Sequence, residues 1–141
     1  MDDTLITPAR KCQSGAEEGT MDFPAIVRAL MEAGFESYTV DYRRETATYF
    51  LPDGDSIELP MARAGAEVAA EFRASAVAQA VREAQANAPG YTYAGFSSTV
   101  KAAGCAGYMV SFPGRRVVYF GRTAETHVEH FHQPTEPVRR P

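Results

Sequence analysis

The sequence predicts an α+β fold in which helices pack on one face of an antiparallel sheet. Three observations predict it: two stretches of the chain match each other at an offset of 70 residues, each opens with apolar residues at helical spacing, and each continues as short alternating strands between turns. Because three strands alone bury an apolar face poorly, we expect both stretches to share one core. The predicted architecture is a tandem duplication of a helix-helix-three-strand antiparallel unit.

The internal match is the first of these observations. Residues 23–50 read FPAIVRALMEAGFESYTVDYRRETATYF, and residues 93–120 read YAGFSSTVKAAGCAGYMVSFPGRRVVYF. The identical pairs lie at a helix end and along strands, and they are Ala33/Ala103, Gly34/Gly104, Tyr38/Tyr108, Val40/Val110, Tyr49/Tyr119 and Phe50/Phe120. We therefore expect residues 23–59 and 93–130 to superpose as one helix and three antiparallel strands.

Each copy opens with a helix that a glycine ends. In the first copy, Asp22 is a candidate N-cap and Pro24 lies in the first turn. Gly34 follows the apolar helical pattern directly, and Gly104 repeats this stop in the second copy. Both glycines are expected to have positive φ, a conformation that costs other residues about 1 kcal/mol or more. The apolar helical positions of the first copy are Phe23, Ile26, Val27 and Leu30.

Period-two alternation follows each helix. Tyr38, Val40 and Tyr42 point to one side of a chain segment whose other side is polar, which predicts a half-buried strand. Pro52-Asp53-Gly54 is a strong hairpin signal between two further strands. The first copy has a turn at 43–45 and strands over 46–51 and 56–59, and the second has a turn at 113–115 and strands over 116–120 and 126–131.

A further helix precedes each copy. Residues 71–86 place apolar side chains on one stripe and are rich in alanine, which favours a helix. The corresponding segment around residues 5–14 is a weaker helix, because Pro8 has to lie in its first turn. We therefore expect residues 1–141 to form a single domain of two repeats, with repeat one over 5–59, a linker over 60–70, repeat two over 71–132 and a flexible tail over 133–141.

Composition excludes several classes of protein. There are 14 basic and 18 acidic residues, and the adjacent arginine pairs lie at turns or in the tail, so we expect no nucleic-acid binding. No apolar run approaches the ~18 residues of a membrane span, and the first twenty residues lack the apolar stretch of a secretory signal. Cys12 and Cys105 are far apart, which argues against a disulfide framework and favours a cytoplasmic location.

The second copy carries a family resemblance. The run AAGCAGYMVSFPGRRVVYFG over residues 102–121, followed by ETHVEHF, resembles small bacterial and prophage proteins that are often labelled "phage envelope protein". The first copy and the segment QAVREAQANAPGYTY also fit, so the resemblance covers roughly residues 8–132. The matching motifs are helix stops, strand alternation and turns. The resemblance therefore implies a fold and names no activity.

Three histidines near the end of the chain are the candidate metal ligands. On a strand, His130 and His132 point to one face, whereas His127 points to the other face with Glu129. A zinc site needs about three or four ligands, and no third ligand is evident from the spacing. We therefore expect no metal site and no cofactor, with metal-dependent hydrolysis through His130 and His132 as the weakest of the functional hypotheses.

Aromatic residues provide two further candidate sites. The inward tyrosines Tyr38, Tyr42, Tyr49, Tyr108 and Tyr119 either pack as core or line a pocket between the two copies. Phe50 and Phe120 point outward, and large apolar residues at outward positions in both copies predict a contact surface. We place these phenylalanines on one face with Asp41, Glu58 and Glu129. The candidate ligand or partner residues are therefore Asp41, Phe50, Glu58, Phe120, His127 and Glu129.

The sequence leaves two main hypotheses of function open. The first is a non-catalytic binding or accessory module that recognises a protein or small molecule, with a homodimer as one form, because no catalytic motif is present. The alternative is a small cofactor-independent enzyme of isomerase, cyclase or lyase type, with a tyrosine-lined pocket between the repeats. A cavity that holds tyrosine hydroxyls and a carboxylate would favour the enzyme.

Overall fold

The computed structural model of the chain describes residues 3–63 and 65–131. In this part of the chain the helices are α1 (Asp3–Glu18), α2 (Phe23–Glu32), α3 (Ala74–Gln85) and α4 (Tyr93–Ala102). The strands are β1 (Ser37–Asp41), β2 (Thr46–Phe50), β3 (Ser56–Pro60), β4 (Cys105–Ser111), β5 (Arg116–Gly121) and β6 (Thr126–His130). Both halves of the chain thus show two helices followed by three strands.

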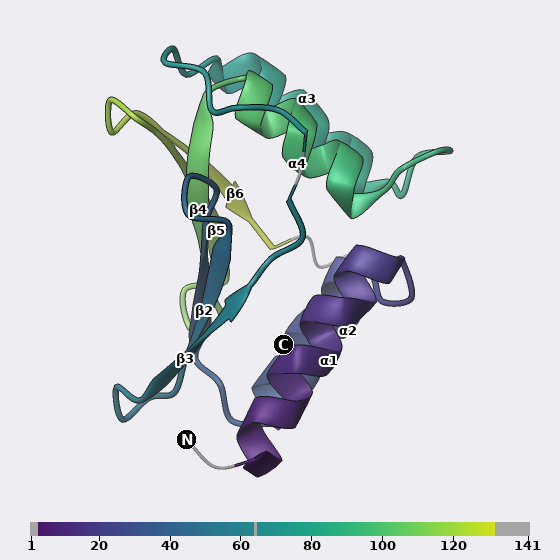
Figure 1. Ribbon diagram of the computed structural model, residues 1–141, viewed down its shortest axis with the longest axis vertical. Coiled ribbons are helices and arrows are strands. Elements are labelled where there is room, and N and C mark those ends of the chain that lie inside the picture. The colour runs from purple at the N-terminus through teal and green to yellow at the C-terminus, as the bar shows by residue number, and fades with distance from the viewer. Residues whose placement is uncertain (1–2, 64, 132–141) are drawn as a thin grey trace, which may run out of the picture.

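The strands form one antiparallel sheet in the order β3-β2-β1-β4-β5-β6. The helix pairs α1/α2 and α3/α4 lie side by side on the same face of this sheet (Figure 1). The predicted α+β class, with helices on one face of an antiparallel sheet, is confirmed. We call the opposite face of the sheet, which no described helix covers, the outer face.

The two halves also share their strand registers. In the central β1–β4 pair Thr39 lies opposite Met109, two residues that are 70 positions apart, as a local twofold axis between the halves requires. The remaining registers match at the same offset: Tyr38↔Tyr49 corresponds to Tyr108↔Tyr119, and Thr48↔Glu58 corresponds to Val118↔Val128. The descent of both halves from one duplicated unit, and the domain boundaries drawn from it, stay predictions.

The glycines that end α2 and α4 both have the positive φ that was predicted. Gly34 has φ +99° and Gly104 has φ +94°. At the end of α2 the amides of Gly34 and Phe35 donate to the carbonyls of Met31 and Leu30, which is the Schellman arrangement. These bonds satisfy the last carbonyls of the helix and turn the chain directly into β1.

The first helix corrects one expectation. α1 begins at Asp3 and continues to Glu18, so Pro8 lies in its second turn and not in its first. Asp3 places a negative charge at the N-terminal end, where the helix dipole favours it. The buried face of α1, formed by Ala9, Cys12 and Gly15, packs toward the core. Burial of this face stabilises the helix despite the hydrogen bond that proline cannot make.

The helix predicted over residues 71–86 begins later than expected. α3 begins at Ala74 and not at residue 71, because the residues before it run along the end of α4. The amide of Ala69 donates to the Lys101 carbonyl at 3.0 Å, and the amide of Arg73 donates to the Ala103 carbonyl at 2.7 Å. These bonds hold this part of the linker against the C-terminal end of α4.

Candidate functional site

The five predicted pocket tyrosines lie in the buried layer between the sheet and the helices. They are at most 6% exposed, and their rings contact one another, with Tyr38 stacked on Tyr49 at 5.3 Å and Tyr108 at 5.3 Å from Tyr119. The Tyr49 hydroxyl donates to Gln13 Oε1 at 2.8 Å, and the hydroxyls of Tyr93 and Tyr108 are 2.8 Å apart. We call these five residues the tyrosine core: Tyr38, Tyr42, Tyr49, Tyr108 and Tyr119.

Two surface cavities lie elsewhere. One of about 280 Å³ lies where the end of α2 meets two strand turns, beside Met31, Gly34 and Phe112. The other, of about 230 Å³, lies between α3 and α4 beside Tyr91 and Phe96. Neither is lined by a member of the tyrosine core. Core packing and a pocket were both open for these tyrosines, and in the structure the rings pack directly against one another, including Tyr38 of the first half against Tyr108 of the second at 6.4 Å.

Burial sets the ionisation of all seven tyrosines of the chain. It raises the pKa of each above the ordinary value of 10, and for Tyr91, which is the least buried of them, to about 12. The folded state favours the neutral phenol. Tyrosine burial therefore contributes its full stabilisation below pH 10, and this contribution is lost as the pH rises above 10.

An alkaline titration tests this packing. Tyrosinate absorbance is expected to stay near zero through pH 10, with Tyr91 ionising first near pH 12, and the rest is expected to appear together with loss of the far-ultraviolet circular dichroism. Half-ionisation near pH 10 with an intact dichroism spectrum would show that solvent reaches the tyrosine core.

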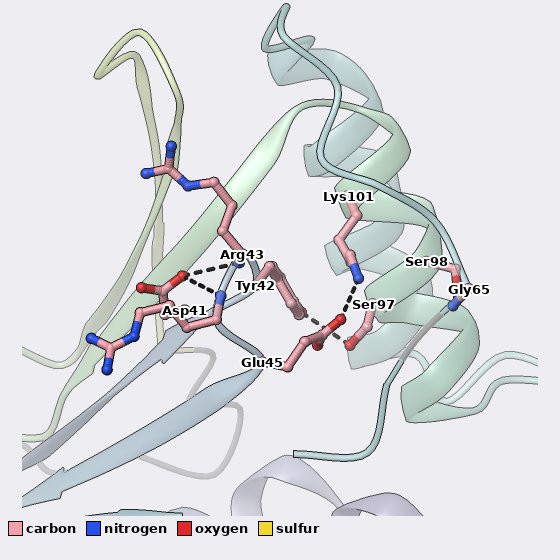
Figure 2. A network of polar contacts seen from close by, with 9 residues as sticks. Asp41, Tyr42, Arg43, Glu45, Gly65, Ser97, Ser98 and Lys101 are labelled. Carbon is pink, nitrogen blue, oxygen red and sulfur yellow. Dashed lines mark hydrogen bonds and ion pairs between the residues drawn. The ribbon is translucent and has the colours of Figure 1, made fainter. Parts of the chain in front are cut away.

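A second group of polar side chains is buried at the corner between β1, β2 and α4 (Figure 2). Lys101 Nζ lies 2.7 Å from Glu45 Oε2, and their side chains are 3% and 9% exposed. Beside them the hydroxyls of Tyr42 and Ser97 are hydrogen-bonded at 3.0 Å, and Lys101 Nζ lies 5.8 Å from the centre of the Tyr42 ring. We call Tyr42, Glu45, Ser97 and Lys101 the polar network.

Local structure explains how the network forms. The Asp41 carboxylate accepts the amides of Arg43 and Arg44 and so shapes the turn after β1 (Figure 2). This turn gives Glu45 a φ of +57°, which is uncommon for a residue other than glycine, and directs its side chain toward α4. Ser97 and Lys101 are four residues apart on α4 and therefore share one face of that helix.

Burial of the ion pair in the polar network costs free energy. A buried ion pair gives up hydration on both groups, so it stabilises the fold only when its remaining polar atoms also find partners. Glu45 Oε1 is buried and has no hydrogen-bond partner among the described residues. The network is therefore held at a cost in free energy.

The counterpart corner, between β4, β5 and α2, consists of different residue types. The residues 70 positions away from Tyr42, Ser97 and Lys101 are Phe112, Val27 and Met31, all apolar, and the counterpart of Glu45 is Arg115, which is exposed. Met31 is 50% exposed and lines the 280 Å³ cavity, whereas the linker covers Lys101. The same architecture thus forms without buried charges at one corner and with them at the other.

On the outer face, the structure places four of the six predicted surface residues together. Strand alternation puts Asp41, Phe50, Glu58 and Phe120 on this face. Phe50 lies opposite Ser37, which is 5% exposed, and the Phe120 ring lies across Gly107. Each phenylalanine therefore covers a small residue on the neighbouring strand and is itself half-buried.

Glu129 and His127 correct the prediction. Glu129 lies opposite Val117 and His127 lies opposite Tyr119, so both point to the helix face. The residue of β6 that corresponds to Glu58 is Val128, and a difference of one residue along a strand reverses the face. His127 Nε2 and Glu129 Oε2 are 2.6 Å apart on that face, as their shared alternation predicts.

The outer face carries an apolar stripe on the second half. Met109, Val118 and Val128 lie opposite one another in register across β4, β5 and β6. Met109 is 42% exposed and Val128 is 40% exposed. Their counterparts in the first half are Thr39, Thr48 and Glu58, all polar. We call Met109, Val118 and Val128 the apolar stripe.

The match to known proteins covers both halves of this arrangement. Residues 13–129 match a family described as proteins of unknown function, DUF1398. The chain belongs to the DUF1398 family. Comparison with curated proteins found no match. A functional assignment for this DUF1398 protein therefore depends on the chemistry of its surface and of its polar network.

The histidines of the DUF1398 chain do not share one face of the sheet. His127 points to the helix face and His130 to the outer face, and His132 lies outside the described residues. Within residues 3–63 and 65–131 no group of three or more histidine, cysteine, aspartate or glutamate side chains is placed to hold a metal ion. Nor does any helix in that part of the chain combine the length and apolar character that a membrane span requires.

Sequence reasoning missed the most unusual residues of this DUF1398 protein. Glu45, Ser97 and Lys101 were not candidates, and neither were Met109 and Val128. The signal was available in the comparison of the two halves, because each of these residues differs in polarity or charge from its counterpart 70 positions away. Differences between the copies, more than the identities, mark the positions that architecture alone does not determine.

Proposed function

We propose that the chain is a non-catalytic binding module that recognises another protein through the outer face of its sheet. The observation that carries the proposal is the apolar stripe, which exposes Met109 and Val128 on a face that no described helix covers. Exposed apolar residues that are contiguous mark interaction surfaces more often than isolated ones do.

The comparison of the two halves supports this function. An antiparallel sheet with one solvated face normally carries polar residues on that face. The first half follows the rule with Thr39, Thr48 and Glu58, and the second half breaks it at each corresponding position. Because the same architecture forms with polar residues there, the stripe is not needed for folding.

The shape of the surface supports a protein as the ligand. The outer face is one side of a six-stranded sheet, and on it Phe50 and Phe120 lie over small neighbours. A small molecule is usually held in a concave pocket that buries most of its area. A broad surface with an apolar centre and a rim of Arg116 and Thr126 is typical of protein–protein contacts.

A photo-crosslinking experiment tests the proposed function. A benzophenone side chain at Met109 is expected to form one discrete adduct, identified by mass spectrometry, in extracts of the producing cells. The same group at Arg28, an exposed position on α2, is expected to form none. Val128→Lys should abolish the Met109 adduct while leaving the circular dichroism unchanged. Equal labelling from both positions, or an adduct that survives Val128→Lys, would contradict the proposal.

The second candidate function is a small cofactor-independent enzyme, and the polar network is the observation that favours it. Buried acid, base and hydroxyl groups in contact are a common feature of catalytic sites. A fragment screen by nuclear magnetic resonance separates the two functions. The enzyme predicts bound fragments that shift the signals of Ser97 and Lys101 and that are lost in the double variant Glu45→Gly, Lys101→Met, whereas the module predicts no such fragments.

A further inference from the structure

We propose that the partner bound by the outer face is a second copy of this chain, packed sheet against sheet. The inference rests on the proposed function and names the partner that the surface fits. It follows from the arrangement of apolar and charged side chains on the two halves of the face, and from the area that the face offers.

The apolar arrangement suits a twofold dimer. One row of outer-face residues crosses the sheet in register, in the order Glu58, Thr48, Thr39, Met109, Val118 and Val128. A twofold axis parallel to the strands, over the β1–β4 boundary, sets each half of one sheet on the opposite half of the other. Met109 then meets the partner's Thr39, Val118 meets the partner's Thr48, and Val128 meets the partner's Glu58. Threonine methyl groups of each copy thereby cover Met109 and Val118 of the other, and the Glu58 side chain lies over Val128.

The charges of the outer face are complementary in the same arrangement. Asp41 and Glu58 lie on β1 and β3, whereas Arg116 and His130 lie on β5 and β6. The twofold described above sets Glu58 opposite the partner's Val128, one strand and two residues away from the partner's Arg116, so these two long side chains can meet diagonally. An axis running across the strands through the same row would stack the two apolar stripes but would also set Glu58 against the partner's Glu58, which is unfavourable.

The groups needed for these contacts are accessible. Glu58 is 48% exposed and lies 3.8 Å from Arg44, whose side chain is 68% exposed. Such an exposed pair contributes little to stability, so Glu58 can exchange it for an intermolecular contact at small cost. Arg116 is exposed and donates from Nε to the Gly114 carbonyl at 3.1 Å, which uses one of the five N–H donors of its guanidinium.

The area of the face indicates a weak dimer. Six strands spaced about 4.8 Å apart, each with at least five residues at about 3.3 Å, give a face of roughly 450 Å². Two such flat faces together bury roughly 900 Å², and projecting side chains add to this area. The value is close to the ~1,000 Å² that a specific interface requires. We therefore expect a reversible dimer with a Kd on the order of micromolar.

Charge reversal in the full chain tests the dimer. Sedimentation velocity from about 1 to 500 µM is expected to show the wild-type chain passing from monomer to dimer. Glu58→Arg and Arg116→Glu are each expected to raise the Kd at least about tenfold, because each contact occurs twice in a twofold dimer. The double variant, with both charges reversed, is expected to dimerise again. Glu32→Arg makes the same charge change at an exposed position of α2 and should leave the Kd unchanged.

The outcomes separate this inference from the proposed function. A wild-type chain that stays monomeric throughout, or a dimer that Glu58→Arg leaves intact, overturns the inference. If the Met109 crosslinker then captures a different protein in a manner that Val128→Lys abolishes, the outer face is still a binding surface and only its partner was wrongly assigned. If the Met109 crosslinker captures nothing and no dimer forms, both proposals are overturned.

Discussion

Replacing Gly104 by alanine is expected to lower the free energy of unfolding by about 3 kcal/mol or more, whereas Gly34→Ala should lower it by only about 1 kcal/mol. Both glycines end a helix with positive φ, at +94° and +99° respectively, so both variants carry the same backbone strain. The difference between them therefore measures steric contact alone.

The surroundings of the two glycines give the physical reason. A Cβ on Gly104 would lie 2.0 Å from the Glu71 carbonyl oxygen and 2.6 Å from its carbon, whereas a Cβ on Gly34 meets no atom of the described residues within 4 Å. The atoms near Gly104 belong to backbone, and the linker cannot move without breaking the bond from the Arg73 amide to Ala103 at 2.7 Å. Urea unfolding followed by circular dichroism measures both variants, and equal losses of stability would contradict this account.

Local pattern was enough to predict most of the architecture. Helical spacing in 23–30, alternation in 38–42 and the glycine stops depend only on neighbours in sequence, and the structure contains each of them. The extent of α1 and the start of α3 were wrong, because burial of the Cys12 face and contacts of the linker with α4 decide them. Those contacts join residues that no local pattern connects.

The candidate site was predicted only in part, and the reason is geometric. Alternation places Phe50 and Phe120 on the outer face, but an assignment one residue out moved Glu129 to the wrong face. Alternation also predicted that the five tyrosines point inward. It does not determine whether their rings leave a cavity between the halves. The Glu45–Lys101 pair joins a strand turn to a helix 56 residues away, so only the assembled fold reveals it.

The same pair is the basis of the second large expected effect. Lys101→Met should lower the free energy of unfolding by about 3–5 kcal/mol, because it leaves the buried Glu45 carboxylate without its cationic partner. Methionine has a similar length and is the residue at the counterpart position, Met31, so the change removes charge with little loss of volume.

A second substitution should restore most of that loss. Glu45→Gly removes the buried carboxylate and also relieves the strain of φ +57°, which glycine adopts readily. Replacement of a buried ion pair by apolar groups is often neutral or stabilising, so the double variant Glu45→Gly, Lys101→Met is expected within about 1 kcal/mol of the wild-type chain. Urea unfolding of the two single variants and the double variant gives the coupling energy between the positions. Additive losses would show that the two charges do not depend on each other, and the polar network would then be a set of independent contacts.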